Sequence, residues 1–178
     1  MRIFLSVILF LFTAFQSANA GGIPGALAGI LSTLNLEIQG KVIRVLDGDT
    51  IEIKTLPAKI VVYEVPIRVR LINIDAPEKK QPFGRWSTSQ LKTLVAGKQV
   101  TVSYSHKDRY GRIIGHVFTT NGTDASRFMV QSGAAWVYER YNADESLPAL
   151  QREAQEQKRG LWADSNPVPP WEWRHKQN

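Results

Sequence analysis

The sequence predicts an α+β fold, mainly a small β-barrel with helices, and three observations lead to this prediction. Short apolar segments rich in β-branched residues or alternating with polar ones are typical of strands. They occur in the order three strands, one helix and two strands, and two more helices follow. This order suits a closed or nearly closed five-stranded barrel of the OB type with three helices. The 178 residues include no cysteine, so the apolar core alone must hold the fold, and thiolate metal sites and cysteine nucleophiles are excluded.

The composition is that of one globular domain with an excess of positive charge. The chain is 43% hydrophobic and 21% charged, with a formal net charge of +6 and a pI of about 9.7. This charge favours an anionic partner such as nucleic acid, anionic lipid or an acidic protein, without choosing among them. An ordinary basic protein with no anionic partner is the alternative.

Residues 1–20 are typical of an export signal. Arg2 supplies a positive charge, an apolar run follows, and Ala18–Asn19–Ala20 has the A-x-A form of a cleavage site. Cleavage near Ala20 would place the mature protein in the periplasm or outside the cell. An uncleaved membrane anchor is the alternative, because no charged residue occurs between Arg2 and Glu37. Residues 21–40 are rich in glycine, and we expect them to form a flexible tether.

The first two strands flank an acidic turn. Residues 41–45 and 50–53 are predicted to form a hairpin whose tip carries Asp47–Gly48–Asp49. Taken alone, Asp-Gly-Asp is a turn far more often than a metal site. The calcium loop of an EF-hand is excluded, because its downstream glycine and bidentate glutamate are missing. Residues 56–66 are expected to form a second, longer hairpin.

The stretch Arg70–Glu78 begins as a strand and delivers several charged side chains. The strand is expected to end at Ala76–Pro77, because proline removes a backbone donor and disfavours helix before it. Arg70 and Asp75 would face opposite sides of a regular strand, so a bulge or a strong bend is needed to bring them together. A surface strand with ordinary ion pairs is the alternative.

Three helices are predicted from the spacing of apolar residues and from the residues at their ends. Each ends at a glycine, which favours the left-handed conformation found after a helix. Thr123 is expected to cap the second helix, and Pro148 fits the first turn of the third. The predicted helices span residues 85–96, 123–133 and 145–159, and the strands between the first two span residues 100–104 and 113–118.

Two aromatic regions complete the chain. Residues 135–141 are typical of core or edge-strand packing and, less often, of a surface on which bases stack. Residues 165–178 form a tail rich in proline and tryptophan. We expect the tail to dock on the body, because exposed tryptophans promote aggregation, and its end from Arg174 onward to fray.

Four motifs together resemble the staphylococcal nuclease (thermonuclease) family. Each is weak alone, but their order and spacing are specific, and they define a nuclease-like domain over residues 41–164. The resemblance implies a five-stranded OB barrel with three helices and a calcium-dependent phosphodiesterase that cuts DNA and RNA with little sequence preference. The motifs are Asp47–Gly48–Asp49–Thr50, Arg70 with Asp75–Ala76–Pro77–Glu78, Asp108–Arg109–Tyr110–Gly111–Arg112 and Gly160–Leu161–Trp162.

The resemblance also implies a role for each residue of the site. Carboxylate and carbonyl oxygens suit calcium, and a guanidinium can donate two parallel hydrogen bonds to a phosphate. Ala76 replaces a threonine often found in the family, so only its backbone can contribute. The implied calcium ligands are Asp49, Asp75 and the carbonyl oxygen of Ala76, with Asp47 as a supporting acid; the implied catalytic residues are Glu78 as general base and Arg70 and Arg112 on the phosphate.

Nucleic acid is the expected partner of basic and aromatic residues around this site. Tyr141 corresponds to a tyrosine that lines the family's nucleotide pocket. Tyr138 lies near the place of a second one, which Glu139 takes in ungapped register. Residues 79–83 are expected to form a basic loop that contains proline. Residues 106–112 are also rich in positive charge, although this segment alone is typical of a solvated basic hairpin. The other residues expected to bind nucleic acid are Lys79, Lys80, Arg109 and Tyr110.

The implied function is therefore a secreted calcium-dependent nuclease that acts on DNA and RNA as a monomer, without a stable protein partner. A noncatalytic OB-type module that binds nucleic acid is the alternative. The enzyme is favoured because a binding module does not need the implied catalytic and calcium-binding side chains together. A third interpretation is a membrane-tethered protein whose basic face meets anionic lipid.

Overall fold

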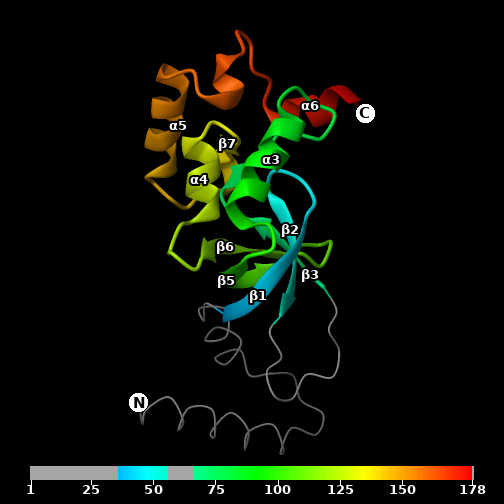
Figure 1. The fold of residues 1–178 in the computed structure, drawn as a ribbon. Helices are drawn as coiled ribbons and strands as arrows, with labels where there is room; N and C mark the ends of the chain where they lie inside the picture. The colour runs from blue at the N-terminus through cyan, green and yellow to red at the C-terminus, as the bar shows by residue number, and fades with distance from the viewer. Residues whose placement is uncertain (1–35, 56–65, 178) are drawn as a thin grey trace, which may run out of the picture. The chain divides into compact units, whose positions relative to one another are not determined.

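A closed five-stranded barrel forms the centre of the protein, described here by a computed structural model of residues 36–55 and 66–177 (Figure 1). The strand order around the barrel is β1-β2-β3-β6-β5. The β3–β6 pair is parallel, with Val69 opposite Ile113, and the other four pairs are antiparallel. The strands are β1 (Leu36–Val45), β2 (Thr50–Thr55), β3 (Ile67–Leu71), β5 (Gln99–Lys107) and β6 (Ile113–Thr119). This architecture confirms the predicted α+β barrel.

The part of the chain that the structure describes has four α-helices, one more than predicted. Helices α3 (Gly84–Val95), α4 (Ala125–Gln131) and α5 (Leu147–Glu156) correspond to the predicted three. The N-cap of α4 is Asp124, which accepts a hydrogen bond from the Arg127 amide, and not Thr123 as predicted. The fourth helix, α6 (Pro170–Gln177), includes most of the residues that were predicted to fray, so that prediction is wrong.

One apolar core fills the barrel and continues beneath two helices. Burial alternates along β6, as expected when successive side chains point to opposite faces of a strand. Leu91 of α3 and Met129 of α4 are fully buried against the inward-facing barrel side chains. Each such side chain contributes about 1.5–3 kcal/mol by leaving water. The helices thus close one end of the barrel and hold the loops above it in place.

The predicted bend between Arg70 and Asp75 is a sharp turn. Strand β3 ends at Leu71, and Asn73 adopts a left-handed conformation with φ 69°, which asparagine tolerates better than most residues. The chain then enters the short strand β4 (Ile74–Asp75), which pairs with β7 (Trp136–Val137). The Asn73 carbonyl accepts a hydrogen bond from the Tyr138 amide at 2.8 Å. This turn lets two side chains an odd number of residues apart meet on one side.

Several predictions concern residues outside those that the structure describes. The signal segment over residues 1–20 lies outside them, and so does almost all of the predicted second hairpin. Strand β1 begins at Leu36, within the range that was predicted to be a tether. Among the helices of the described residues, none has the length and apolar character needed to cross a membrane.

Candidate active site

The β1–β2 turn places two acidic residues at the mouth of the barrel. The Asp49 amide donates a hydrogen bond to Asp47 Oδ1 at 3.1 Å, which folds the turn. A Cβ atom on Gly48 would lie 2.0 Å from Ser87 Oγ and 2.7 Å from the Ala76 Cβ. Glycine is therefore required here by the close packing of the turn against α3 and the strand end at Ala76. This packing presents Asp49, which is 6% exposed, to the site.

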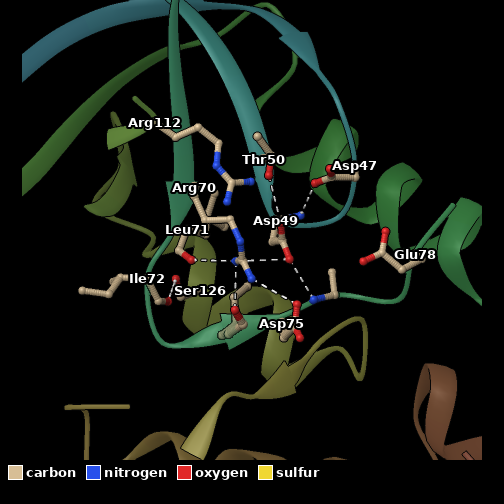
Figure 2. Close-up of polar contacts among 12 residues, drawn as sticks. Asp47, Asp49, Thr50, Arg70, Leu71, Ile72, Asp75, Glu78, Arg112 and Ser126 are labelled. Carbon is tan, nitrogen blue, oxygen red and sulfur yellow. Dashed lines mark hydrogen bonds and ion pairs between the residues drawn. The ribbon is translucent and has the colours of Figure 1, made fainter. Parts of the chain in front are cut away.

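Arg70 joins the two aspartates predicted to bind calcium (Figure 2). Its Nη1 lies 3.1 Å from Asp49 Oδ2, and its Nη2 donates to Asp75 Oδ1 at 3.0 Å. The same Nη1 also donates to the carbonyl oxygens of Leu71 and Ile74, at 3.1 and 2.9 Å. These contacts fix the guanidinium to the backbone on both sides of the Asn73 turn. Arg70 is thereby a positioning residue for both carboxylates as well as a candidate phosphate ligand.

The backbone of Ala76 lies directly beside Asp49. The Ala76 amide donates to Asp49 Oδ2 at 2.9 Å, and Asp49 Oδ1 accepts from the Thr50 hydroxyl at 2.9 Å. Asp75 precedes Ala76 and is 1% exposed. The structure therefore brings the two predicted carboxylate ligands together, with the backbone of Ala76 beside them. In the described residues, no group of three or more acidic or histidine side chains is arranged to hold a metal ion by itself.

Burial gives this acidic group unusual electrostatics. Burial, together with repulsion from Asp49, raises the pKa of Asp47 to about 7. Burial also raises the pKa of Asp75 above its ordinary value, although hydrogen bonds from Arg174 oppose this effect. Carboxylates that are removed from water and placed near one another favour binding a cation or a proton. The donor set contains only hard oxygen atoms and fits calcium in its chemistry.

Glu78 follows on a loop that the structure holds tightly. The Glu78 amide donates to Gln81 Oε1 at 3.1 Å, and the Gln81 amide donates back to the Glu78 carbonyl at 2.8 Å. Gly84 packs so closely on this loop that a Cβ atom there would lie 1.8 Å from the Glu78 carbonyl oxygen. The Glu78 side chain is 44% exposed and points to the same side of the molecule as Asp49 (Figure 2). It is therefore accessible to a water molecule near the aspartates.

Arg112 reaches the site from the turn before β6. Its Nε donates to Asp108 Oδ2 at 2.8 Å, and Asp108 Oδ1 accepts from the amides of Tyr110 and Arg112. The terminal nitrogens of Arg112 make no hydrogen bond within the described residues and point toward Arg70 and Thr50 (Figure 2). Asp108 thus orients a guanidinium whose outer donors remain available to a phosphate.

The predicted nucleic-acid contacts separate into three places. Tyr110 is 69% exposed, and the guanidiniums of Arg109 and Arg112 lie 4.9 and 5.6 Å from its ring centre. Tyr138 and Tyr141 meet edge to face with centroids 4.9 Å apart. Tyr141 is 60% exposed, whereas the Tyr138 ring is covered by a parallel ring, that of Trp171.

Lys79 and Lys80 lie in the third place, an open groove beside Glu78. The groove has a volume of about 890 Å³ and is also lined by Arg85 and by aromatic rings from α3 and α6. These three cations form no ion pair within the residues that the structure describes. The aromatic residues along the groove are Phe83, Trp86 and Trp173.

Arg174 is the site residue that the sequence did not reveal. Its Nη2 lies 2.6 Å from Asp75 Oδ2, and its Nη1 lies 2.8 Å from Glu78 Oε1 and 3.2 Å from Asp75 Oδ1. Burial opposes its charge, but the hydrogen bonds that it donates to both carboxylates hold the pKa of Arg174 above its ordinary value. The two tryptophans that precede it, Trp171 and Trp173, were the available signal, since they predicted that the tail docks.

Comparison with known proteins finds a matching family model and several similar proteins. Residues 68–164 match the family model described as staphylococcal nuclease homologue. A protein of Escherichia coli named an uncharacterized endonuclease is 59% identical over 140 residues, which cover 79% of this chain and 87% of that protein. A protein of Shigella flexneri named micrococcal nuclease is 38% identical over 148 residues, which cover 78% of this chain and 81% of that protein.

Proposed function

The chain belongs to the staphylococcal nuclease family, and from this premise we propose that it is a calcium-dependent endonuclease that hydrolyses phosphodiester bonds in DNA and RNA. The observation that carries the proposal is the position of Arg70. Its guanidinium holds two buried aspartates beside the Ala76 backbone, while Glu78 and Arg112 face the same space. Little sequence preference is expected, because the available donors suit a phosphate and not a base edge.

Calcium would be held by Asp49, Asp75 and the Ala76 carbonyl, with Asp47 in support. The raised pKa values of Asp47 and Asp75 support this assignment, because a cation relieves the repulsion that burial intensifies. When bound, calcium supplies positive charge against the negative charge that develops on the phosphate.

The protein side chains would divide the remaining work. Glu78 would accept a proton from a water molecule as the water oxygen bonds to phosphorus and the bond to the leaving oxygen breaks. Arg112 would donate its free terminal N–H groups to the phosphate oxygens. Arg70 would keep the two aspartates in place, and its Nε, which makes none of the contacts described above, remains as a donor.

The groove beside Glu78 would hold the strand that leads away from the site. Its cations, Lys79, Lys80 and Arg85, form no ion pair with another described residue and suit a run of phosphates, and its aromatic rings suit base stacking. Binding here would be independent of sequence and would weaken as salt increases. Tyr110 and Arg109 would extend the contact on the other side.

Cleavage of labelled DNA and RNA tests this function. We expect the purified mature protein to cut both with calcium and to cut neither with chelator. Glu78→Gln should lower the rate by roughly 10²–10⁴, the range for a positioned general base. Glu156→Gln, an exposed change of the same charge on α5, should leave the rate unchanged. Binding without cleavage in every cation tested would contradict the proposal.

A noncatalytic nucleic-acid-binding module is the second candidate. One observation favours it, because Arg174 neutralises both Asp75 and the candidate base Glu78. Such a module would bind labelled DNA in a salt-dependent way, and Glu78→Gln would change nothing. The cleavage assay therefore separates the two candidates.

We also propose that the protein is exported. The support is the segment over residues 1–20 with its A-x-A site. N-terminal sequencing of the protein from a periplasmic or culture fraction should find a start at Gly21. Recovery only with detergent, and with residue 1 or 2 at the start, would favour the membrane-anchored alternative.

A further inference from the structure

We propose that helix α6 is a built-in cap on the active site, and that Arg174 must leave Asp75 and Glu78 before calcium and the attacking water can use them. This inference rests on the proposed function, because it concerns the same carboxylates. In Figure 1, α6 is the red helix at the C-terminus, near the start of α3. The match to the family model ends at residue 164, so α6 lies outside the part of the chain that the model describes.

Arg174 donates hydrogen bonds to both oxygens of the Asp75 carboxylate. Arg174 takes Oδ2 at 2.6 Å and shares Oδ1 with Arg70, at 3.2 and 3.0 Å. A divalent cation that bound the same oxygens would meet the positive charge of Arg174 at close range. Cation and guanidinium therefore compete for Asp75, and Arg174 stands in for the missing positive charge when no cation is bound.

Arg174 also engages the candidate general base. Its Nη1 lies 2.8 Å from Glu78 Oε1, so a carboxylate that should accept a proton already accepts a charge-assisted hydrogen bond. This contact occupies Oε1, which could otherwise accept the proton of the attacking water. One side chain thus blocks both the metal ligand and the base.

Trp171 on the same helix covers an aromatic ring of the predicted nucleotide pocket. Its ring lies parallel to Tyr138 at 8° with centroids 5.4 Å apart, and edge-on to Trp136 at 5.7 Å. A base that stacked on this face of Tyr138 would need the space that Trp171 fills. Arg174 and Trp171 therefore occupy the places of two ligands, with a cationic group on the carboxylates where a metal cation would bind and a flat ring on the tyrosine where a base would stack.

The helix is built so that it can leave. It has eight residues, and isolated helices of this length are marginal in water. The Arg174 and Glu78 side chains are 42% and 44% exposed, so water can replace their contact. The segment before α6 is tied to the body by the Gln81 amide, which donates to the Val168 carbonyl at 2.6 Å. Release of the helix therefore requires loss of the Arg174 contacts and of the Trp171 ring contacts, while the tail stays attached through Val168.

Calcium binding to the mature protein, measured by calorimetry without substrate, tests the cap. Arg174→Gln should bind calcium about tenfold more tightly, because a partly exposed charge-assisted hydrogen bond is worth roughly one factor of ten. Arg152→Gln on α5, an exposed arginine without an ion pair in the described residues, makes the same charge change and should leave the affinity unchanged. Cleavage at limiting calcium should rise in Arg174→Gln alone.

A second variant leaves every charge in place. Trp171→Ala removes the stack on Tyr138 and should also tighten calcium binding, by a smaller factor. Hydrogen exchange gives an independent measurement, since calcium should increase the exchange of the α6 amides in the wild-type protein. Thermal melts confirm that each variant is folded.

The possible outcomes distinguish failure of the proposed cap from failure of the proposed nuclease function. Equal calcium affinity in wild type and Arg174→Gln, with exchange in α6 unchanged by calcium, would overturn the cap and leave the proposed nuclease intact. Weaker cleavage by Arg174→Gln at saturating calcium would overturn it in favour of a third phosphate-binding arginine. No calcium binding and no cleavage by any form would overturn both proposals.

Discussion

Two arginines from distant parts of the sequence bind the same carboxylate, that of Asp75. They differ in the element that carries them, in their exposure to solvent and in their other hydrogen-bond partners. Arg70 comes from the barrel, is 14% exposed and is also fixed to two backbone carbonyls. Arg174 comes from the terminal helix, is 42% exposed, and its hydrogen bonds go only to carboxylates. The comparison teaches that an ion pair with a site carboxylate can serve different purposes. An arginine that is buried and bound to the backbone holds the site in place, whereas an exposed arginine bound only to carboxylates can leave it.

The largest expected difference is in stability. Arg70→Ala leaves the buried Asp49 without its arginine partner and leaves Asp75 with Arg174 alone, which should lower the free energy of unfolding by about 3–5 kcal/mol. Arg174→Ala removes a more exposed pair and should cost about 1 kcal/mol or less. Urea unfolding of both variants in chelator measures the contrast, with Arg152→Ala as control. Equal losses would show that the two arginines are anchored alike.

The next prediction concerns the close packing of the β1–β2 turn at Gly48. Gly48→Ala drives a methyl group into Ser87 and Ala76 and should cost about 1–3 kcal/mol. Ser87→Gly removes the nearer obstacle, so the double variant should recover part of the loss in urea unfolding. Ser87 Oγ is buried without a hydrogen-bond partner, so its removal leaves no new polar atom unpaired. A double variant no more stable than Gly48→Ala would show that the turn is held elsewhere.

A pH effect should arise at the same turn. The pKa of Asp47 in the folded protein is about 7, above its ordinary 3.8, so the folded state keeps a proton that the unfolded chain has lost. The free energy of unfolding should therefore fall as pH rises from about 4 to 7, by at most about 1.4 kcal/mol per unit from this group. Asp47→Asn should remove that part of the slope in chelator. An identical slope in wild type and variant would contradict it.

The smallest effect concerns the cap. Trp171→Ala removes an aromatic stack worth about 1 kcal/mol, which should lower the Tm by about 2–4 °C in calorimetry. Calcium should narrow the difference between the variant and the wild type, because α6 is then already released. If the difference in Tm is the same with and without calcium, Trp171 stays packed on the body in both states and is not part of a cap that moves.

The sequence predicted the barrel and the three helices that close it, because apolar periodicity and terminal glycines report local structure. The resemblance to the nuclease family implied that Arg70, Asp49 and Asp75 belong to one site, and the structure brings the three side chains together. The sequence did not predict that Arg174 belongs to the site. Its contacts with Asp75 and Glu78 span 99 and 96 residues, and no pattern in an eight-residue helix indicates which side chain meets a distant carboxylate.

Smaller differences have local causes. Thr123 and Asp124 are both good capping residues, and only the path of the chain leaving β6 selects Asp124. The bend before Asp75 required an unusual backbone conformation at Asn73, which a run of β-branched residues does not indicate. Tertiary contacts decided each case.

The parallel pairing of β3 with β6 makes the active site a late product of folding. Arg70 lies opposite Ile114, so Arg70 and the turn that carries Arg112 become neighbours only when these two strands meet. Their encounter closes a long chain loop, and such contacts form late because the entropy cost comes before the gain. A chain with an open barrel therefore has no complete set of phosphate donors. Activity would then report barrel closure directly, and a cell that makes such a nuclease would hold only inert chains until folding ends.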